Sequence, residues 1–251
     1  MATVKKLESS ERDQIARLIN PRVASDAQAA YYALEHPSER VSLFGYFPQE
    51  GILSGFVAIA QTGFDLFRPL IVPFTGTDDS LIQLLEGALP ENRPHLIYLP
   101  IEQESVLDDD DRFVLEKLQL SSLLRLDPRG FEPILNILVL EDENSEGWPR
   151  FEIKARGGGF AAAGLNWKSK FAAEMYIESD EEGRRRGFSK SVLSTLIDRL
   201  LAENLLVLFR VTDDDYGSFE DAFDLGFVPT GVRSVLAQVV MDSREKEVQG
   251  R

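Results

Sequence analysis

Residues 181–190 read EEGRRRGFSK, three consecutive arginines and a glycine in a chain of 251 residues with a formal net charge of -15. A strand-like stretch, AEMYIES at 173–179, precedes them, and a helical pattern with one apolar stripe, SKSVLSTLIDRLLAEN at 189–204, follows. This order places free N–H groups and the positive end of a helix dipole beside the arginines. Gly187 lets the backbone approach an anion closely. The stretch therefore predicts an anion-binding loop.

A second interpretation of the same loop is purely structural. Glu178, Asp180, Glu181 and Glu182 lie immediately before the arginines, and charge-mixed loops often balance opposite charges in this way. The sequence alone leaves both interpretations open.

The elements outward from this loop form a pattern that occurs twice. The second half has the predicted order strand, strand, loop, helix, strand, helix, strand, and the first half has a compatible order. In the first half we expect two short helices within 8–34, strands at 40–47, 52–61, 67–74 and 95–100, and a helix after Thr77. Two prolines place the strand at 67–74 at a sheet edge or a bulge.

The middle of the chain joins the two halves. The acids Asp108–Asp111 predict the solvated start of a helix, since metal loops alternate their ligands with spacers and glycine. A core strand is expected at 131–140, and the acid- and turn-rich residues 141–150 are the best candidate for a linker.

Composition excludes several classes of site. The chain has no cysteine and only two histidines, His36 and His95, in unrelated contexts, so disulfides, thiolate nucleophiles, zinc centres and histidine triads are not expected. No run of 18 apolar residues occurs, and residues 1–18 carry charges where a signal peptide needs apolar residues, so we expect a cytoplasmic protein without a membrane partner. The negative net charge argues against a nucleic-acid partner and leaves the arginine loop as the place for a small anion.

The spacing Arg184-x-x-Gly187-x-Ser189 resembles the motif Arg/Gln-x-x-Gly-x-Gly/Ala of the GNAT superfamily of N-acetyltransferases. The stretch DDDYGSFEDAFDLGF at 213–227 is similar to a second GNAT motif, Asn-x-x-Ser/Ala before a short helix and Gly-Phe, with Asp215 in the asparagine position and Ser218 in register. The resemblance extends over about 151–241. It implies that the arginine loop binds the pyrophosphate of acetyl-coenzyme A (acetyl-CoA) through backbone amides.

The resemblance also implies roles for individual residues. The cofactor-binding set comprises the backbone of Tyr176 and Ile177, which would pair with the pantetheine arm, together with Arg184, Arg185, Arg186, Gly187, Phe188, Ser189, Asp215 and Ser218. Glu174 resembles the catalytic glutamate of histone-type GNAT enzymes and would be the general base, unless it faces solvent or pairs with a neighbouring cation. Tyr216 is the nearest phenol for a general acid, with a surface or packing role as the alternative.

The sequence departs from the family pattern at three positions. Ser189 replaces glycine or alanine, a small change because serine is also compact. Asp215 replaces an asparagine and contributes no amide donor. Ala222 stands where many members carry the tyrosine that protonates the leaving thiolate, so that general acid is missing or comes from elsewhere.

We therefore expect an α/β (α+β) protein of two GNAT-like units, each a mixed, mostly antiparallel sheet flanked by helices. Residues 1–140 would form a degenerate unit, 141–150 a linker and 151–251 the unit that binds acetyl-CoA. The loop before the first-half helix has acids at 78 and 79 in place of arginines, which would repel a pyrophosphate. An unrelated α/β domain remains the alternative for that half.

The expected activity is transfer of an acetyl group to an amine of a small molecule or a peptide, by a monomer or a homodimer without a metal ion. The negative charge would favour a cationic acceptor such as a polyamine, an aminoglycoside or a lysine side chain. A non-catalytic acyl-CoA-binding module and a purely structural interaction domain are the alternatives.

Overall fold

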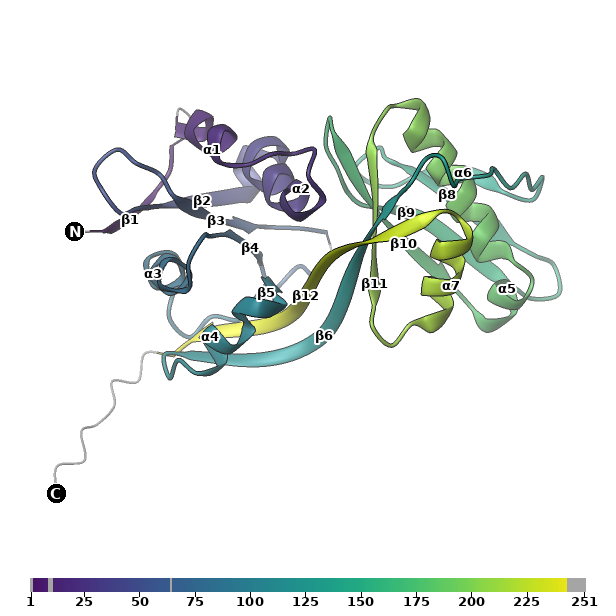
Figure 1. Cartoon of the computed structure of the whole chain (residues 1–251). Coiled ribbons are helices and arrows are strands. Elements are labelled where there is room, and N and C mark those ends of the chain that lie inside the picture. Colours follow the sequence, from purple (N-terminus) through teal and green to yellow (C-terminus); the bar gives the residue numbers. More distant parts are fainter. Residues whose placement is uncertain (1, 9–10, 64, 243–251) are drawn as a thin grey trace, which may run out of the picture. The chain divides into compact units, whose positions relative to one another are not determined.

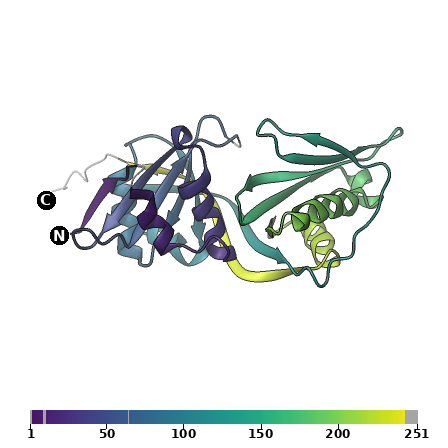
Figure 2. The same cartoon turned by 90° about the horizontal axis from the view of Figure 1, so that it is seen from above.

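A computed structural model describes residues 2–8, 11–63 and 65–242 and divides the chain into two compact units. Unit 1 comprises Met1–Asn20, Gln28–Leu120 and Arg233–Arg251, and unit 2 comprises Pro21–Ala27 and Ser121–Val232. In each unit, helices pack against a mostly antiparallel sheet (Figures 1 and 2). The predicted fold class, a mixed α/β arrangement of sheets flanked by helices, is confirmed.

The elements, in chain order, are β1 (Thr3–Lys6), α1 (Arg12–Leu18), α2 (Ala24–Ala30), a π-helical turn (Tyr31–Glu35), a 3-10 turn (Ser38–Arg40), β2 (Val41–Phe47), β3 (Gly55–Ala60), β4 (Leu70–Phe74), α3 (Asp78–Ala88), β5 (His95–Pro100), a 3-10 turn (Ile101–Gln103), α4 (Glu104–Asp108), β6 (Phe113–Leu126), β7 (Leu140–Glu143), β8 (Pro149–Lys154), β9 (Phe160–Lys168), β10 (Ala172–Ser179), α5 (Glu181–Arg185), α6 (Phe188–Ala202), β11 (Leu206–Thr212), α7 (Tyr216–Asp224) and β12 (Phe227–Met241). Among the described residues, no helix combines the length and the apolar character needed to cross a bilayer.

The sheet of unit 1 has the strand order β1-β2-β3-β4-β5-β12-β6. Strands β4 and β5 pair in parallel, and the segment with α3 is the crossover connection that a parallel pair needs. The apolar side of α3, with Leu81, Leu84 and Leu85, is fully buried against the sheet. This stripe repeats every three to four residues, which is why the segment folds as a helix that covers one face.

The sheet of unit 2 has the corresponding order β7-β8-β9-β10-β11-β6-β12. Here β10 and β11 are the parallel pair, and α5 and α6 connect them. Val192, Leu193, Leu196 and Ile197 of α6 are fully buried in one core with the inward side chains of the sheet. The predicted helical stripe of 189–204 is therefore the core face of α6.

Two long strands belong to both units. The first part of β6 lies in unit 1 and its last part, from Ser121, in unit 2, whereas β12 begins in unit 2 and continues into unit 1 from Arg233. In unit 1, β12 lies between β5 and β6, and in unit 2, β6 lies between β11 and β12. Each sheet therefore has an interior strand from a segment distant in sequence.

Because β6 and β12 each run from one unit into the other, the chain divides differently from the prediction. The boundary predicted at 140 lies instead at Leu120–Ser121, and the last part of β12 returns to unit 1. The predicted linker 141–150 is not a linker: it contains most of β7, a turn and the start of β8, and Glu141 pairs with Phe151 across that hairpin. Acid- and turn-rich composition here marks a hairpin tip at the edge of a sheet.

Three local predictions are wrong. The helix expected after Asp108–Asp111 is instead the first part of strand β6, because its place beside β12 in the sheet of unit 1 overrides the helix preference of its Leu, Glu and Lys residues. The core strand expected at 131–140 is irregular up to β7, and Leu135 and Ile137 are almost fully exposed. The proline-containing strand β4 is interior, where Pro73 is tolerated because the ladder to β5 ends at Ile71.

Candidate functional site

The two parallel strands of unit 2, β10 and β11, pair along only the first half of their length. Strands β10 and β11 pair from Ala172 opposite Leu206 to Met175 opposite Phe209, and no pairing between them continues beyond those residues in the described structure. Strand β10 runs on to Ser179 along β9, with a register shift between Glu174 and Met175. The backbone edge of Tyr176 and Ile177 that faces β11 is thus left without a partner strand among the described residues.

Asp180 closes the end of β10 and starts α5. Its Oδ1 accepts hydrogen bonds from the backbone N–H of Gly183 at 2.6 Å and of Phe160 at 3.0 Å. These two hydrogen bonds, with Phe160 first, lower the pKa of the Asp180 carboxyl group. Gly183 is required here because a Cβ atom would lie 2.2 Å from the carbonyl oxygen of Phe160.

Gly187 begins α6 without a capping side chain. Its φ of 72° lies in the left-handed region, and no side chain caps the helix. A Cβ atom at Gly187 would meet nothing within 4 Å, so the space in front of the helix is open. The N–H groups of the first turn, with the positive end of the helix dipole, are available to an anion there.

The three arginines of the loop each have a separate partner. Arg184 Nη1 lies 3.3 Å from Asp215 Oδ1, and Arg185 Nη2 lies 2.7 Å from Glu182 Oε2. Arg186 Nη1 donates to the carbonyl oxygen of Gly158 at 2.8 Å. The acids before the loop therefore balance part of its charge, and an arginine would have to exchange its present partner to contact an anion directly.

Phe188 and Ser189, the first residues of α6, are almost completely buried. Arg186 lies over the ring of Phe188, 4.5 Å from its centroid, so Phe188 anchors the loop to the core. Ser189 Oγ has no hydrogen-bond partner among the described residues. A compact residue is thus needed at this position, as in the motif, and its hydroxyl group is not essential to the fold.

Asp215 and Ser218 cap α7. Asp215 Oδ1 accepts from the backbone N–H of Ser218 at 3.1 Å, and Oδ2 accepts from the Ser218 hydroxyl at 2.6 Å. This capping arrangement explains both residues without a ligand. Tyr216, the first residue of α7, is 76% exposed, whereas Ala222 is fully buried. The structure therefore gives Asp215 and Ser218 capping roles and places the Tyr216 phenol in solvent.

Glu174 is the buried acid of β10. Its Oε2 lies 3.1 Å from Arg210 Nη2, and its Oε1 accepts from Asn166 Nδ2 at 3.1 Å. The side chains of Glu174 and Arg210 are only 2% and 9% exposed. Arg210 follows Phe209, the last residue of β11 that pairs with β10. The charge pair therefore lies where the two parallel strands begin to part.

Glu174 lies on the sheet face opposite α6. Its neighbours Ala173 and Met175 both belong to the core that α6 covers, and side chains alternate between the two faces of a strand. Of the two expectations for Glu174, pairing with a cation is confirmed, and its role as a base remains a prediction.

A pocket of about 500 Å³ also lies within unit 2. Arg22, Arg125, Leu206 and Thr230 are among the residues that line it. Arg22 additionally lies over the ring of Phe171, with 4.6 Å between the guanidinium carbon and the ring centroid. Two arginines give this pocket a positive lining in an acidic protein.

The sequence prediction missed Asp180, Asn166 and Arg210. Asp180 could have been found, because an aspartate directly before a short run of helix-forming residues is a typical N-cap. Arg210 also carried a signal, since a lone charge within the apolar stretch LLVLFRVT requires a partner when buried. Nothing in the sequence marked Asn166.

No protein-family model matches the sequence, and no curated protein is significantly similar to it. Solved structures are similar over nearly the whole chain. A GCN5-related N-acetyltransferase from Sphaerobacter thermophilus is 9% identical, with 94% of this chain and 95% of that chain covered and a TM-score of 0.61. A tandem GNAT protein from the clavulanic acid biosynthesis pathway is 9% identical, with coverages of 98% and 100% and a TM-score of 0.60.

A GNAT-family acetyltransferase from Colwellia psychrerythraea is 12% identical, with coverages of 95% and 99% and a TM-score of 0.59. Together with the sheet order repeated in each unit, these likenesses decide the fold. The chain has a tandem GNAT fold. The sheet of unit 1 repeats the strand order of unit 2, which favours a GNAT-like first half over an unrelated domain.

The two units differ at the long helix between their parallel strands, α3 in unit 1 and α6 in unit 2, although the short helix α5 before α6 is capped by Asp180. In unit 1, the side chain of Thr77 caps α3 by accepting from the N–H of Ser80, and Asp78 and Asp79 occupy the first turn. In unit 2, α6 begins at Gly187 with no side-chain cap and no acid in its first turn. Only the helix of unit 2 leaves its positive end open to an external anion.

Acetyl-CoA fits most of the predicted residues. The open N-terminus of α6 suits a pyrophosphate, and the free edge of Tyr176 and Ile177 suits the amide groups of a pantetheine arm. Asp215 is the exception, because its carboxylate is committed to Ser218 and Arg184. In the described ranges, no three His, Asp or Glu side chains gather as a metal site would require.

Proposed function

We propose that unit 2 binds acetyl-CoA and transfers its acetyl group to an amine of a small molecule or a peptide. The observation that carries this proposal is the combination of parted parallel strands with the uncapped N-terminus of α6, which follows β10 and the short helix α5. The tandem GNAT fold supports acyltransferase activity in general. Unit 1 would not bind the cofactor, because the side chain of Thr77 already caps the N-terminus of α3.

The proposed binding mode assigns separate tasks to loop and strand. Backbone N–H groups in the first turn of α6, at Phe188 and Ser189, would hold the pyrophosphate in a fixed geometry. The N–H of Gly187 already donates to the carbonyl oxygen of Arg184 at 3.0 Å. The backbone of Tyr176 and Ile177 would hold the pantetheine arm as an added strand does. Acetyl-CoA supplies the thioester whose acetyl group is transferred.

Glu174 remains our candidate for the general base. An acceptor amine must lose a proton before it attacks a thioester, and Glu174 is a carboxylate at the point where the strands part. Both carboxylate oxygens are now occupied, so proton transfer requires one hydrogen bond to open. The bond from neutral Asn166 to Oε1 is the weaker of the two, because the bond from Arg210 to Oε2 joins opposite charges. Oε1 is therefore the proposed proton acceptor.

Tyr216 is the proposed proton donor to the leaving thiolate. Its phenol is exposed and makes no hydrogen bond within the described residues. A Tyr216→Phe variant with an unchanged transfer rate would remove it from this role. Arg22 and Arg125 line the other pocket of unit 2, and an acceptor bound there would carry an anionic group besides its amine.

Thiol release from acetyl-CoA tests the activity. We would incubate the protein with acetyl-CoA and a panel of amines that includes a polyamine, an aminoglycoside, amino acids and a lysine-containing peptide. Release with at least one amine, lost in Gly187→Glu, is the expected result. Binding of acetyl-CoA without release from any amine would instead identify unit 2 as an acyl-CoA-binding module.

A further inference from the structure

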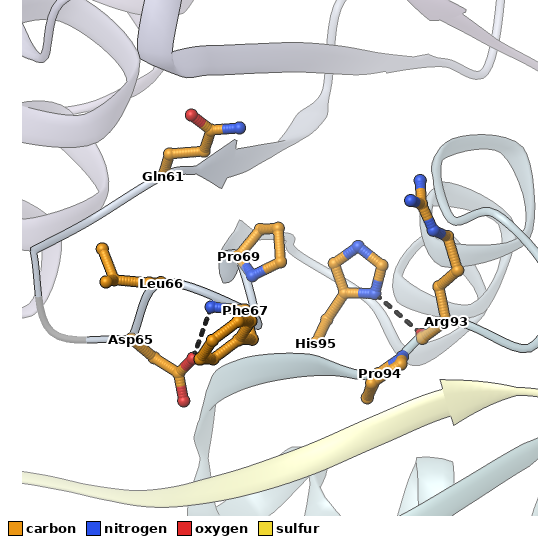
Figure 3. Close-up of a pocket in the computed structure, with 8 residues that line it drawn as sticks. All are labelled: Gln61, Asp65, Leu66, Phe67, Pro69, Arg93, Pro94 and His95. Carbon is orange, nitrogen blue, oxygen red and sulfur yellow. Dashed lines mark hydrogen bonds between the residues drawn. The ribbon is translucent and has the colours of Figure 1, made fainter.

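A separate pocket of about 240 Å³ lies within unit 1. Its lining comes from three places: Gln61 after β3, the loop 65–69 before β4, and residues 93–95 at the start of β5 (Figure 3). These are the ends of β4 and β5 opposite to the end from which α3 begins. The pocket is therefore remote from the helix N-terminus of its own unit and shares no residue with the site in unit 2.

His95 presents an unused nitrogen to this pocket. The residue is only 5% exposed, and its Nδ1 lies 3.0 Å from the carbonyl oxygen of Arg93, to which it must donate. Burial lowers the pKa of His95, so the ring is neutral at pH 7 and Nε2 is a hydrogen-bond acceptor. Figure 3 shows Nε2 pointing away from that carbonyl group, on the side of the pocket where the Arg93 guanidinium lies.

The free charge in the lining is positive. Arg93 has no ion pair among the described residues. Asp65 is already satisfied: Oδ1 accepts from the N–H groups of Phe67 at 2.8 Å and Arg68 at 2.9 Å, and Oδ2 pairs with the Arg68 guanidinium at 2.8 Å. An unpaired guanidinium beside a neutral acceptor favours an anionic ligand that also carries a hydrogen-bond donor.

Apart from Gln61, the remaining lining residues are apolar. Phe67 and Leu66 are 91% and 86% exposed, which is unusual for large apolar side chains, and the two hydrogen bonds to Asp65 fix their loop. Pro69 and Pro94 face the same space (Figure 3). The volume is below the roughly 300–1,000 Å³ of pockets for drug-sized ligands. A single substituted ring is the size of ligand that such a pocket holds.

We propose that this pocket binds a small aromatic carboxylic acid that carries a hydroxyl group. The carboxylate would pair with Arg93, the hydroxyl would donate to His95 Nε2, and the ring would lie against Phe67, Pro69 and Pro94. Binding at this place requires neither acetyl-CoA nor the activity proposed for unit 2.

Nuclear magnetic resonance of the histidine rings tests the proposal directly, because the chain contains only two histidines. The full-length protein, labelled with ¹⁵N-histidine, is titrated with 4-hydroxybenzoate, and a His95→Gln variant assigns the signals. We expect a saturable shift of the His95 Nε2 resonance. Benzoate, which lacks the donor, and 4-hydroxybenzamide, which lacks the charge, should each bind at least about tenfold more weakly.

A matched pair of variants locates the anion. Arg93→Met keeps the length of the side chain without its charge and should weaken 4-hydroxybenzoate binding at least about tenfold. Arg17→Met, an exposed arginine of α1 in the same unit, should leave binding unchanged. No saturable shift up to roughly 10 mM ligand, equal binding of the neutral amide, or unchanged binding by Arg93→Met would each overturn the proposal.

Discussion

Gly187 is the residue at which the binding geometry of unit 2 is most easily tested. Its φ of 72° disfavours any side chain, but a Cβ atom would meet no neighbour. Gly187→Ala should therefore lower the free energy of unfolding by about 1 kcal/mol and weaken acetyl-CoA binding only slightly. Gly187→Glu should have a similar stability and abolish binding, because its carboxylate would occupy the anion site. Calorimetry and urea unfolding of both variants measure the two effects separately.

Glu174 and Arg210 form a buried ion pair whose disruption should lower the free energy of unfolding strongly. Removal of one partner leaves the other charge buried and unpaired, so Glu174→Ala should lower the free energy of unfolding by about 3–5 kcal/mol. The double variant Glu174→Leu with Arg210→Met should recover most of this loss, since apolar side chains of similar size can replace a buried pair. Denaturant unfolding of the single and double variants gives the coupling, and additive losses would contradict the interpretation.

The catalytic role of Glu174 needs a milder change. Glu174→Gln keeps the shape of the side chain and one acceptor oxygen, but it loses the charge opposite Arg210 and cannot take up a proton at neutral pH. With folding verified, we expect acetyl-CoA affinity to be retained and the transfer rate to fall at least about a hundredfold. If the rate is unchanged in this variant, Glu174 is only a structural partner of Arg210.

Asp180 should make stability depend on acid pH. Its folded-state pKa is lowered by the hydrogen bonds from Phe160 and Gly183, so its stabilising effect is complete above the unfolded value of about 3.9 and is lost as the pH falls through the lower folded value. Asp180→Asn should be less stable than wild type at pH 7, and the difference should shrink below about pH 4. Urea unfolding at several pH values measures this, and a constant difference would argue against a carboxylate effect.

At the scale of elements, α3 and α6 have the same place in the two GNAT units but different N-termini. Thr77→Ala removes the side-chain cap of α3 and should cost about 1 kcal/mol of stability. The affinity for acetyl-CoA should not change, because α3 has no part in the proposed binding. A loss of affinity in this variant would mean that unit 1 contributes to the cofactor site.

Local sequence patterns predicted the elements whose apolar residues repeat at a regular spacing. The apolar stripe around Val192 and Leu196 predicted α6. The stretch before it was expected to be a loop throughout, but residues Glu181–Arg185 form the short helix α5. The helix expected after Asp111 failed because a strand of Leu, Glu and Lys residues is recognisable only from its neighbour β12, which lies far along the chain. The partner of Glu174 was unpredictable for the same reason, since Arg210 is brought near by strand pairing and not by sequence spacing.

At the scale of the whole molecule, the exchange of β6 and β12 should make the halves interdependent. A fragment 1–120 lacks the last part of β12, so β5 and β6 of unit 1 lose the strand between them. We expect this fragment to be unfolded by circular dichroism and amide exchange. The same fragment joined through a short turn to 233–242 should fold, and independent folding of the unmodified 1–120 would contradict the assignment.

The central claim is that one of the two GNAT units binds acetyl-CoA. Calorimetric titration of the full-length protein with acetyl-CoA tests it most directly, with Gly187→Glu as the matched control. We predict saturable binding of one acetyl-CoA per chain in the wild type and none in Gly187→Glu. No binding to the wild type, two molecules per chain, or undiminished binding to the variant would contradict the claim.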